Sequence, residues 1–225
     1  MALSIITRTA APDDVCIDIA EALRYMGYKH AQPDQQTSAL IQDCVNELKN
    51  AVNYTACLSE ISISVRDDEI DFGFLQIKSR DLSKNLSGCD RAVLFAATIG
   101  TGTDRLIAKY GKLQPSRALI LDALGSAAIE GWCNLLNEQV RAIAEKNNRF
   151  LRPRFSAGYG DFPIAIQPQL LNALDAHRKA GIYLTDSCMM LPTKSVSAVI
   201  GVSDRPRASK AGCAACGQTD CMYKI

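Results

Sequence analysis

The ten residues RFSAGYGDFP, at positions 154–163, are the most informative stretch of this 225-residue chain. Gly158 and Gly160 flank Tyr159, and glycine allows both a positive φ and a close approach of the backbone to a ligand. Arg154 lies four residues before Gly158, and its planar guanidinium suits a carboxylate. The stretch therefore predicts an ordered loop. It either binds a small zwitterionic ligand with an aromatic or apolar portion, or it is a surface loop in which Arg154 forms an ion pair.

Helical and strand patterns surround this loop. A long helix is expected over residues 116–146, and the continuous apolar run AVLFAATI at 92–99 predicts a buried strand. After the loop, the sequence predicts a helix at 168–181 and a strand at 195–202 (SVSAVIGV). The remaining expected elements are helices at 15–26, 38–50 and 103–110 and strands at 61–65, 72–77 and 182–186, with a charged turn at 66–71. This mixture indicates an α+β body.

The composition is that of an ordinary globular protein. Hydrophobic residues make up 48% and charged residues 22%, and 25 Lys and Arg against 24 Asp and Glu leave a net charge of +1. A near-neutral chain does not favour electrostatic capture of nucleic acid or of an anionic membrane. The longest apolar runs fall short of the roughly 18 residues of a transmembrane helix, and residues 1–11 lack a signal-like apolar core. We therefore expect a cytoplasmic protein that has neither nucleic acid nor membrane as a partner.

One face of the expected long helix is unusual. Small or polar residues recur there at spacings of three and four around a single carboxylate, that of Glu130. They are Ser126, Ala127, Cys133, Asn134 and Asn137. The face is either a solvated helix surface or the wall of a groove, where short side chains leave room and Glu130 binds an amine or hydroxyl of a ligand.

Three ordered blocks of the sequence carry a resemblance to a known family. They are RFSAGYGD at 154–161, IYLTDSCMM at 182–190 and PTKSVSAV at 192–199. The activation domain of cobalamin-dependent methionine synthase has an Arg-x-x-x-Gly-Tyr loop, a helix, a Leu-Thr-Glu-Ser-x-x-Met segment and then Pro-x-x-Ser-Val-Ser-Gly. Three blocks in this order with matching gaps are far more specific than any one of them. The chain resembles this family over roughly residues 116–203, which is under half of its length.

The resemblance implies a C-shaped α+β fold, with a central twisted and mainly antiparallel sheet flanked by helices, and a shallow groove that binds S-adenosylmethionine. Arg154 would hold the methionine carboxylate, while Ser156, Gly158 and Tyr159 would supply backbone and ring contacts. The EQVR run at 138–141 resembles the Glu-Arg-Val-Arg helix end of the family, which places Glu130 at a ligand-binding glutamate. A tyrosine beyond the Ser-Val-Ser strand and an early aspartate of the family have no evident counterpart.

In the family, this domain presents the methyl group of S-adenosylmethionine to a corrinoid whose cobalt has reached the inactive Co(II) state, and a partner supplies an electron. The present sequence has no cobalamin-binding Asp-x-His-x-x-Gly motif. It therefore resembles a stand-alone member that acts on the cobalamin of a separate protein, either a methionine synthase or another corrinoid methyltransferase. Such an accessory protein positions the methyl donor and needs no general acid or base.

We expect three segments in the chain. A helical and β-hairpin region at 1–85 would pack on the same body as an S-adenosylmethionine-binding core at 86–205. A cysteine-rich tail would follow at 206–225. Five cysteines before residue 150, at positions 16, 44, 57, 89 and 133, are predicted to be small core residues.

The tail holds Cys213, Cys216 and Cys221 in a C-x₂-C-x₄-C spacing. A C-x₂-C pair aims two thiolates at one centre, which suits zinc or an iron–sulfur cluster. Cys188 or a second chain would supply the fourth ligand. The alternatives are a reduced tail without metal and a tail ordered by zinc alone. A metal- or thiol-based redox role in a corrinoid methyltransferase system, acting through these cysteines, is the second functional interpretation.

Overall fold

The computed structural model describes residues 3–28 and 31–206 of the chain. Its centre is a five-stranded antiparallel sheet in the order β1-β2-β6-β10-β7. These strands are β1 (Ile6–Ala10), β2 (Tyr54–Ser62), β6 (Cys89–Thr98), β10 (Ser195–Ser203) and β7 (Phe150–Leu151). A small antiparallel sheet contains β3 (Ser64–Arg66), β4 (Glu69–Asp71) and β5 (Gln76–Lys78), and β8 (Tyr183–Leu184) pairs with β9 (Met190–Leu191). The expected α+β fold with a mainly antiparallel sheet is confirmed.

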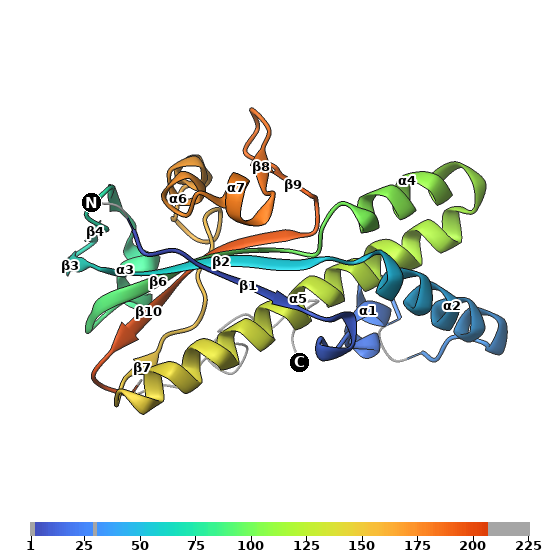
Figure 1. The fold of residues 1–225 in the computed structure, drawn as a ribbon, viewed down its shortest axis with the longest axis horizontal. Coiled ribbons are helices and arrows are strands. Elements are labelled where there is room, and N and C mark those ends of the chain that lie inside the picture. The colour runs from blue at the N-terminus through green and yellow to red at the C-terminus, as the bar shows by residue number, and fades with distance from the viewer. Residues whose placement is uncertain (1–2, 29–30, 207–225) are drawn as a thin grey trace.

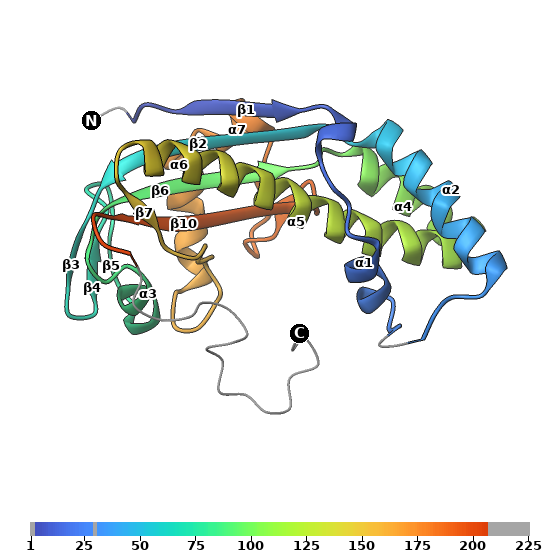
Figure 2. The same cartoon turned by 90° about the horizontal axis from the view of Figure 1, so that it is seen from below.

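Helices cover both faces of the central sheet (Figure 1). On one face lie α1 (Ile19–Tyr25), α2 (Gln35–Ala51) and α5 (Pro115–Lys146), with α4 (Gly102–Leu113) beside α5. On the other face lie α3 (Arg80–Asn85), α6 (Gln167–Ala173) and α7 (Ala176–Ala180). Two short 3₁₀ turns cover Pro12–Asp14 and Ile164–Ile166. Figure 2 shows α5 running across the first face.

The central strands β2, β6 and β10 are mostly buried because both faces of the sheet are covered. Val93 and Phe95 of β6 pack into the core on the α5 face, whereas Leu94 and Ala96 pack into the core under α3, α6 and α7. Successive side chains of a strand point to opposite faces of the sheet, so a strand buried on both faces shows no polar alternation. The strands expected at 92–99 and 195–202 are confirmed as β6 and β10, which pair along their whole lengths.

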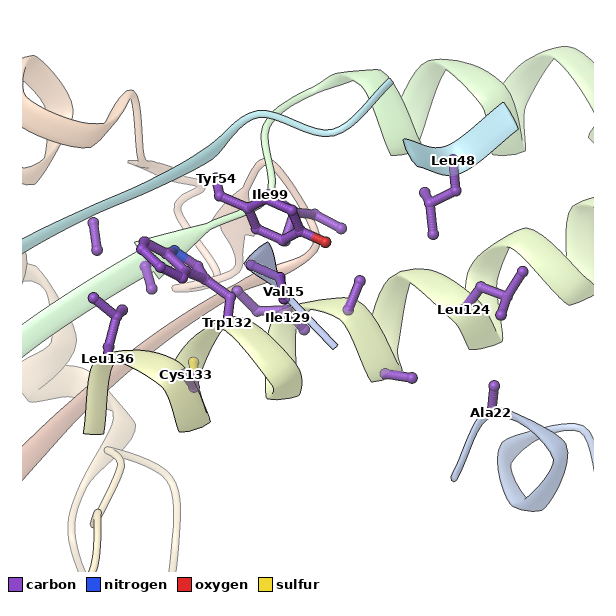
Figure 3. Close-up of a cluster of buried hydrophobic side chains, with 14 of the residues drawn as sticks. Val15, Ala22, Leu48, Tyr54, Ile99, Leu124, Ile129, Trp132, Cys133 and Leu136 are labelled. Atoms are coloured by element: carbon purple, nitrogen blue, oxygen red, sulfur yellow. The ribbon is translucent and has the colours of Figure 1, made fainter. Parts of the chain in front are cut away.

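The long helix α5 supplies much of the core on its face of the sheet. Trp132 is fully buried there and points toward Tyr54 of β2, with 5.8 Å between the ring centroids (Figure 3). The indole Nε1 of Trp132 donates a hydrogen bond to the carbonyl oxygen of Thr55 at 3.3 Å. By length and composition α5 is a candidate membrane span, but 61% of its most apolar stretch is buried inside the protein. This burial is what a core helix shows.

The N-terminal segment crosses α5 in close contact. A Cβ at Gly131 would lie 2.1 Å from the carbonyl oxygen of Cys16, so only glycine leaves room for this crossing. The helix expected at 15–26 is therefore shorter than predicted, and α1 begins only at Ile19, capped by the carboxylate of Asp18. Cys16 is exposed, so its prediction as a core residue is wrong, whereas Cys44, Cys57, Cys89 and Cys133 are buried as expected.

Other expected elements also have different limits in the structure, and the strand expected at 72–77 is reduced to β5 (Gln76–Lys78), because residues 72–75 form a turn. The strand expected at 61–65 belongs to β2, which begins at Tyr54, and to β3. The charged turn expected at 66–71 is confined to Asp67 and Asp68, because Glu69–Asp71 forms β4. The helix expected at 168–181 is divided into α6 and α7, since Asp175 adopts a left-handed φ of 47° between them. None of these differences alters the fold class.

Candidate functional site

The small and polar face of α5 is covered by side chains from the last third of the chain. The Lys194 ammonium, just before β10, lies 2.8 Å from the Asp122 carboxylate and donates to Ser126 Oγ at 2.9 Å. The stem of Lys194 runs over Gly125, whose Cβ position would be 3.3 Å from two of its carbons. One turn or more further along α5, Arg154 covers Glu130 and Asn134. Short side chains on this face therefore leave room for two long cations.

Residues 150–155 follow the outer edge of β10. Beyond β7, the amide of Phe155 donates to the Val199 carbonyl and the amide of Val199 donates to the Phe155 carbonyl, both at 2.9 Å. The chain then leaves the strand and forms a closed turn. Gly158 has a φ of 94°, and its amide donates to the Phe162 carbonyl at 2.8 Å. This turn holds Tyr159 away from the body, with 69% of its surface exposed.

Arg154 joins the loop to the helix. Its Nη2 donates to Glu130 Oε2 at 3.1 Å and to Asn134 Oδ1 at 3.0 Å. Its other terminal nitrogen, Nη1, is buried and has no hydrogen-bond partner among the residues that the structure describes. An unpaired buried donor costs roughly 1–3 kcal/mol. The guanidinium is thus held against α5 through Nη2, and one of its other donors has no partner among the described residues.

Cys133 lies under this guanidinium. Burial raises the pKa of the Cys133 thiol to about 12, although the nearby Arg154 opposes the shift. A thiol with such a pKa is protonated at neutral pH and is neither a nucleophile nor a ready metal ligand. Cys133 therefore acts as a small apolar residue beneath the site.

We expect the native protein to react with iodoacetamide at Cys16 but not at Cys133. At pH 8, a thiol with a pKa near 12 is thiolate in roughly one molecule in ten thousand, and Cys133 is buried whereas Cys16 is exposed. Peptide mass mapping after a short exposure at pH 8 measures the two sites separately. Equal labelling of both residues in the folded protein would contradict the burial described above.

A shallow pocket of about 290 Å³ lies between the loop and α5. Its lining consists of Glu130, Arg154, Phe155, Ser156, Tyr159 and Val196. A carboxylate and a guanidinium thus share one wall, an aromatic ring lies at the rim, and Phe155 and Val196 add apolar surface. Such a surface has groups for both charges of a zwitterion and for an apolar portion of the same ligand.

A larger groove of about 420 Å³ lies near the C-terminal end of α5, between this helix and the sheet. Its lining is mainly aliphatic, with Leu136, Val140 and Ile143 from α5. Of its charged residues, Arg91 is paired with Glu60 at 3.1 Å, and Arg149 forms an ion pair with Asp90. Of these two pockets, only the smaller one combines opposite charges with an aromatic ring.

The sequence model of one family, described as the vitamin B12-dependent methionine synthase activation domain, matches residues 80–221. The match covers more than half of the chain and includes α5, the loop and β10. The chain belongs to this family. A comparison with curated proteins finds none that matches this chain.

A solved structure supports the fold of this activation domain. It is a crystal structure of the MetH reactivation domain bound to AdoHcy, with a TM-score of 0.68. The alignment covers 93% of this chain and 81% of that chain, at 15% sequence identity. The similarity therefore extends beyond the segment that the family model matches, into the residues before position 80.

Most of the ligand-binding residues predicted from the sequence of this activation domain meet at one place. Glu130, Arg154, Ser156 and Tyr159 line the pocket, and Gly158 shapes the turn that carries Tyr159. Their binding of a ligand stays a prediction. Sequence reasoning identified Asn134 only as part of the polar face, and it did not single out Phe155 and Val196 as lining residues. The spacing of Asn134 one helical turn after Glu130 was the available signal.

Of the four predicted metal ligands, Cys188 alone lies within the described residues. Cys188 is half-buried in the turn between β8 and β9, where its carbonyl oxygen accepts a hydrogen bond from Gln167 Nε2 at 3.1 Å. Cys213, Cys216 and Cys221 lie outside the described residues. Within residues 3–28 and 31–206, no group of three or more His, Cys, Asp or Glu side chains is placed to hold a metal ion. The metal site in the tail stays a prediction.

Proposed function

We propose that this activation domain binds S-adenosylmethionine in the pocket between the loop and α5. The observation that carries the proposal is the contact of Arg154 with Glu130 on one wall of that pocket. The methionine portion of the ligand is a zwitterion, with a carboxylate and an ammonium on one carbon. Arg154 would bind the carboxylate through its planar fork, and Glu130 would bind the ammonium.

A zwitterionic ligand would add partners to Glu130 and Arg154 and would leave neither charge without an opposite neighbour. The Glu130 and Arg154 side chains are 38% and 24% exposed, so their direct ion pair is partly screened by water. A zwitterion placed beside them adds one acceptor for the guanidinium and one donor for the carboxylate, and each charge keeps an opposite neighbour. Ser156 and the ring of Tyr159 then contact the remainder of the ligand.

The function that follows is the reactivation of a corrinoid on a separate protein. The family of this chain and the AdoHcy found in the similar reactivation domain support a role that involves S-adenosylmethionine. The corrinoid, carried by a methionine synthase or another methyltransferase, supplies a cobalt nucleophile once a reductant has provided an electron. The present chain contributes position: it holds the sulfonium methyl group at an open surface that a partner can approach.

Calorimetric titration of the purified protein with AdoHcy and with S-adenosylmethionine tests the proposal. Because Arg154 and Glu130 would contact the amino-acid portion, which both ligands share, we expect saturable one-to-one binding of both. 5′-Methylthioadenosine lacks that portion and should bind at least tenfold more weakly. Equal affinity for methylthioadenosine and AdoHcy would contradict the assignment of the two charged residues, and failure to bind either ligand would contradict the function.

A further inference from the structure

Asp161 is the one charged residue of the stretch 155–163, and it does not line the pocket. Its carboxylate instead accepts three hydrogen bonds from consecutive residues at the junction of β5 and α3. Ser79 Oγ donates to Asp161 Oδ1 at 2.5 Å, and the amide of Asp81 donates to the same oxygen at 3.1 Å. The amide of Arg80 donates to Asp161 Oδ2 at 2.7 Å. The loop is thus bound to a segment about 80 residues earlier in the chain.

This junction is itself well anchored. Ser79 is 1% exposed, its amide donates to the Asp68 carbonyl at 2.8 Å, and its hydroxyl accepts from the amide of Leu82 at 3.1 Å. Leu82 is fully buried in the core under α3 and α6. The Ser79 hydroxyl therefore connects the N-terminus of α3 to Asp161, and a movement of the loop would break a partly buried hydrogen bond to this serine.

The neighbouring residues fit this contact closely. Gly160 has a φ of 54°, and a Cβ at that position would lie 2.4 Å from Asp81 Oδ2. Phe162 is 1% exposed, and its amide donates to the Tyr159 carbonyl at 3.0 Å. The hydrogen bond from Ser79 is the largest of the influences that lower the pKa of the Asp161 carboxyl, so this carboxylate is ionised at neutral pH. Asp161 and Phe162 hold one end of the turn that carries Tyr159, while Phe155 holds the other on β10.

We propose that Asp161 is a positioning residue: it fixes the turn at 156–160 against the start of α3, so that Ser156 and Tyr159 are already placed for the ligand. The proposal rests on the proposed function, because it names what orders that same pocket. It also gives the β5–α3 segment a part in ligand binding without any contact with the ligand. Ordering a loop before binding removes an entropic cost from the binding step.

Two linked measurements on Asp161→Asn test this proposal. The substitution removes the charge and turns an amide NH₂ toward the donors of the junction. We expect the dissociation constant for AdoHcy to rise at least threefold. If the loss comes from a loop that is no longer ordered, a threefold rise means that the loop is in place in no more than about a third of the molecules. Hydrogen exchange should then show almost no protection of the amides of Gly158, Tyr159 and Phe162.

The controls separate a local effect from general destabilisation. Amides of β6 and β10 serve as an internal reference and should keep their protection in Asp161→Asn. Asp71→Asn removes a carboxylate of the small sheet that, in the part of the chain the structure describes, is hydrogen-bonded to Gly73 and Gln76 alone, and it should leave both readouts unchanged. Ser79→Ala, which removes one of the three donors, should change both in the same direction by a smaller amount.

Wild-type affinity of Asp161→Asn for AdoHcy, or weakened affinity with full protection of the loop amides, would overturn the proposal. Absence of AdoHcy binding by the unmodified protein would instead overturn the proposed function. In that case the hydrogen-exchange measurement alone decides whether Asp161 orders the loop. Unchanged protection of the loop amides in Asp161→Asn would then contradict the proposal.

Discussion

Arg154→Ala is expected to weaken the binding of AdoHcy and of S-adenosylmethionine by roughly 10- to 100-fold. Among the described residues that line the proposed pocket, Arg154 is the only cation, and the substitution leaves Glu130 without its partner at 3.1 Å. A hydrogen-bonded charge pair with a ligand contributes roughly 1.5–3 kcal/mol, and 100-fold corresponds to about 2.7 kcal/mol. Calorimetric titration measures the loss directly.

Two comparisons make the Arg154 result specific. Arg154→Lys keeps the charge but loses the planar fork, so we expect an intermediate affinity. Arg178→Ala removes a cation of α7 whose side chain is 80% exposed, and it should leave the affinity unchanged. The residual affinity for 5′-methylthioadenosine should be the same in all of these variants. An Arg154→Ala protein that binds AdoHcy as the unmodified protein does would remove the central residue of the proposed site.

Trp132→Ala is expected to have the largest effect on stability. The side chain is fully buried against Tyr54 between α5 and the sheet (Figure 3), and its removal leaves the Thr55 carbonyl oxygen without the Nε1 donor. Truncation of a buried tryptophan costs about 3–5 kcal/mol, which for a chain of this size lowers the melting temperature by roughly 6–20 °C. Urea unfolding followed by circular dichroism measures the change, because the variant lacks the single tryptophan.

Leu113→Ala is the control for Trp132→Ala. Leu113 ends α4 with 72% of its surface exposed, and exposed substitutions of this kind change stability by less than about 0.5 kcal/mol. A loss below 1 kcal/mol in Trp132→Ala would contradict the packing of α5 on the sheet.

The sequence alone was enough to predict the elements that have long apolar or amphipathic runs. The long apolar and amphipathic run of α5, and the continuous apolar runs of β6 and β10, can be recognised without knowledge of their neighbours. β2 was recognised only at its end, because its residues are buried on both faces and YTACLSE shows no alternation. The division between α6 and α7 depends on one residue, Asp175, in a left-handed conformation. Propensity does not indicate such a break.

The candidate site was predictable in part for a similar reason. Glu130 and Arg154 each lie in a pattern that can be read locally, one on a helix face and one before a glycine-flanked tyrosine. The bonds of Asp161 to Ser79, Arg80 and Asp81 join residues about 80 positions apart. Nothing in the sequence around either segment indicates that they meet. Contacts of this kind follow from topology, which a single sequence does not specify.

The family match begins at residue 80, whereas two strands of the central sheet, β1 and β2, lie before that residue. β2 pairs with β6 from Thr55↔Thr98 to Ser62↔Arg91, and β1 covers the outer edge of β2. A fragment that started where the family similarity starts would expose the backbone of β6 along eight residue pairs, as a long apolar edge that invites association with other chains. A fragment intended to fold on its own should therefore include the N-terminal third of the chain, which the family model does not match.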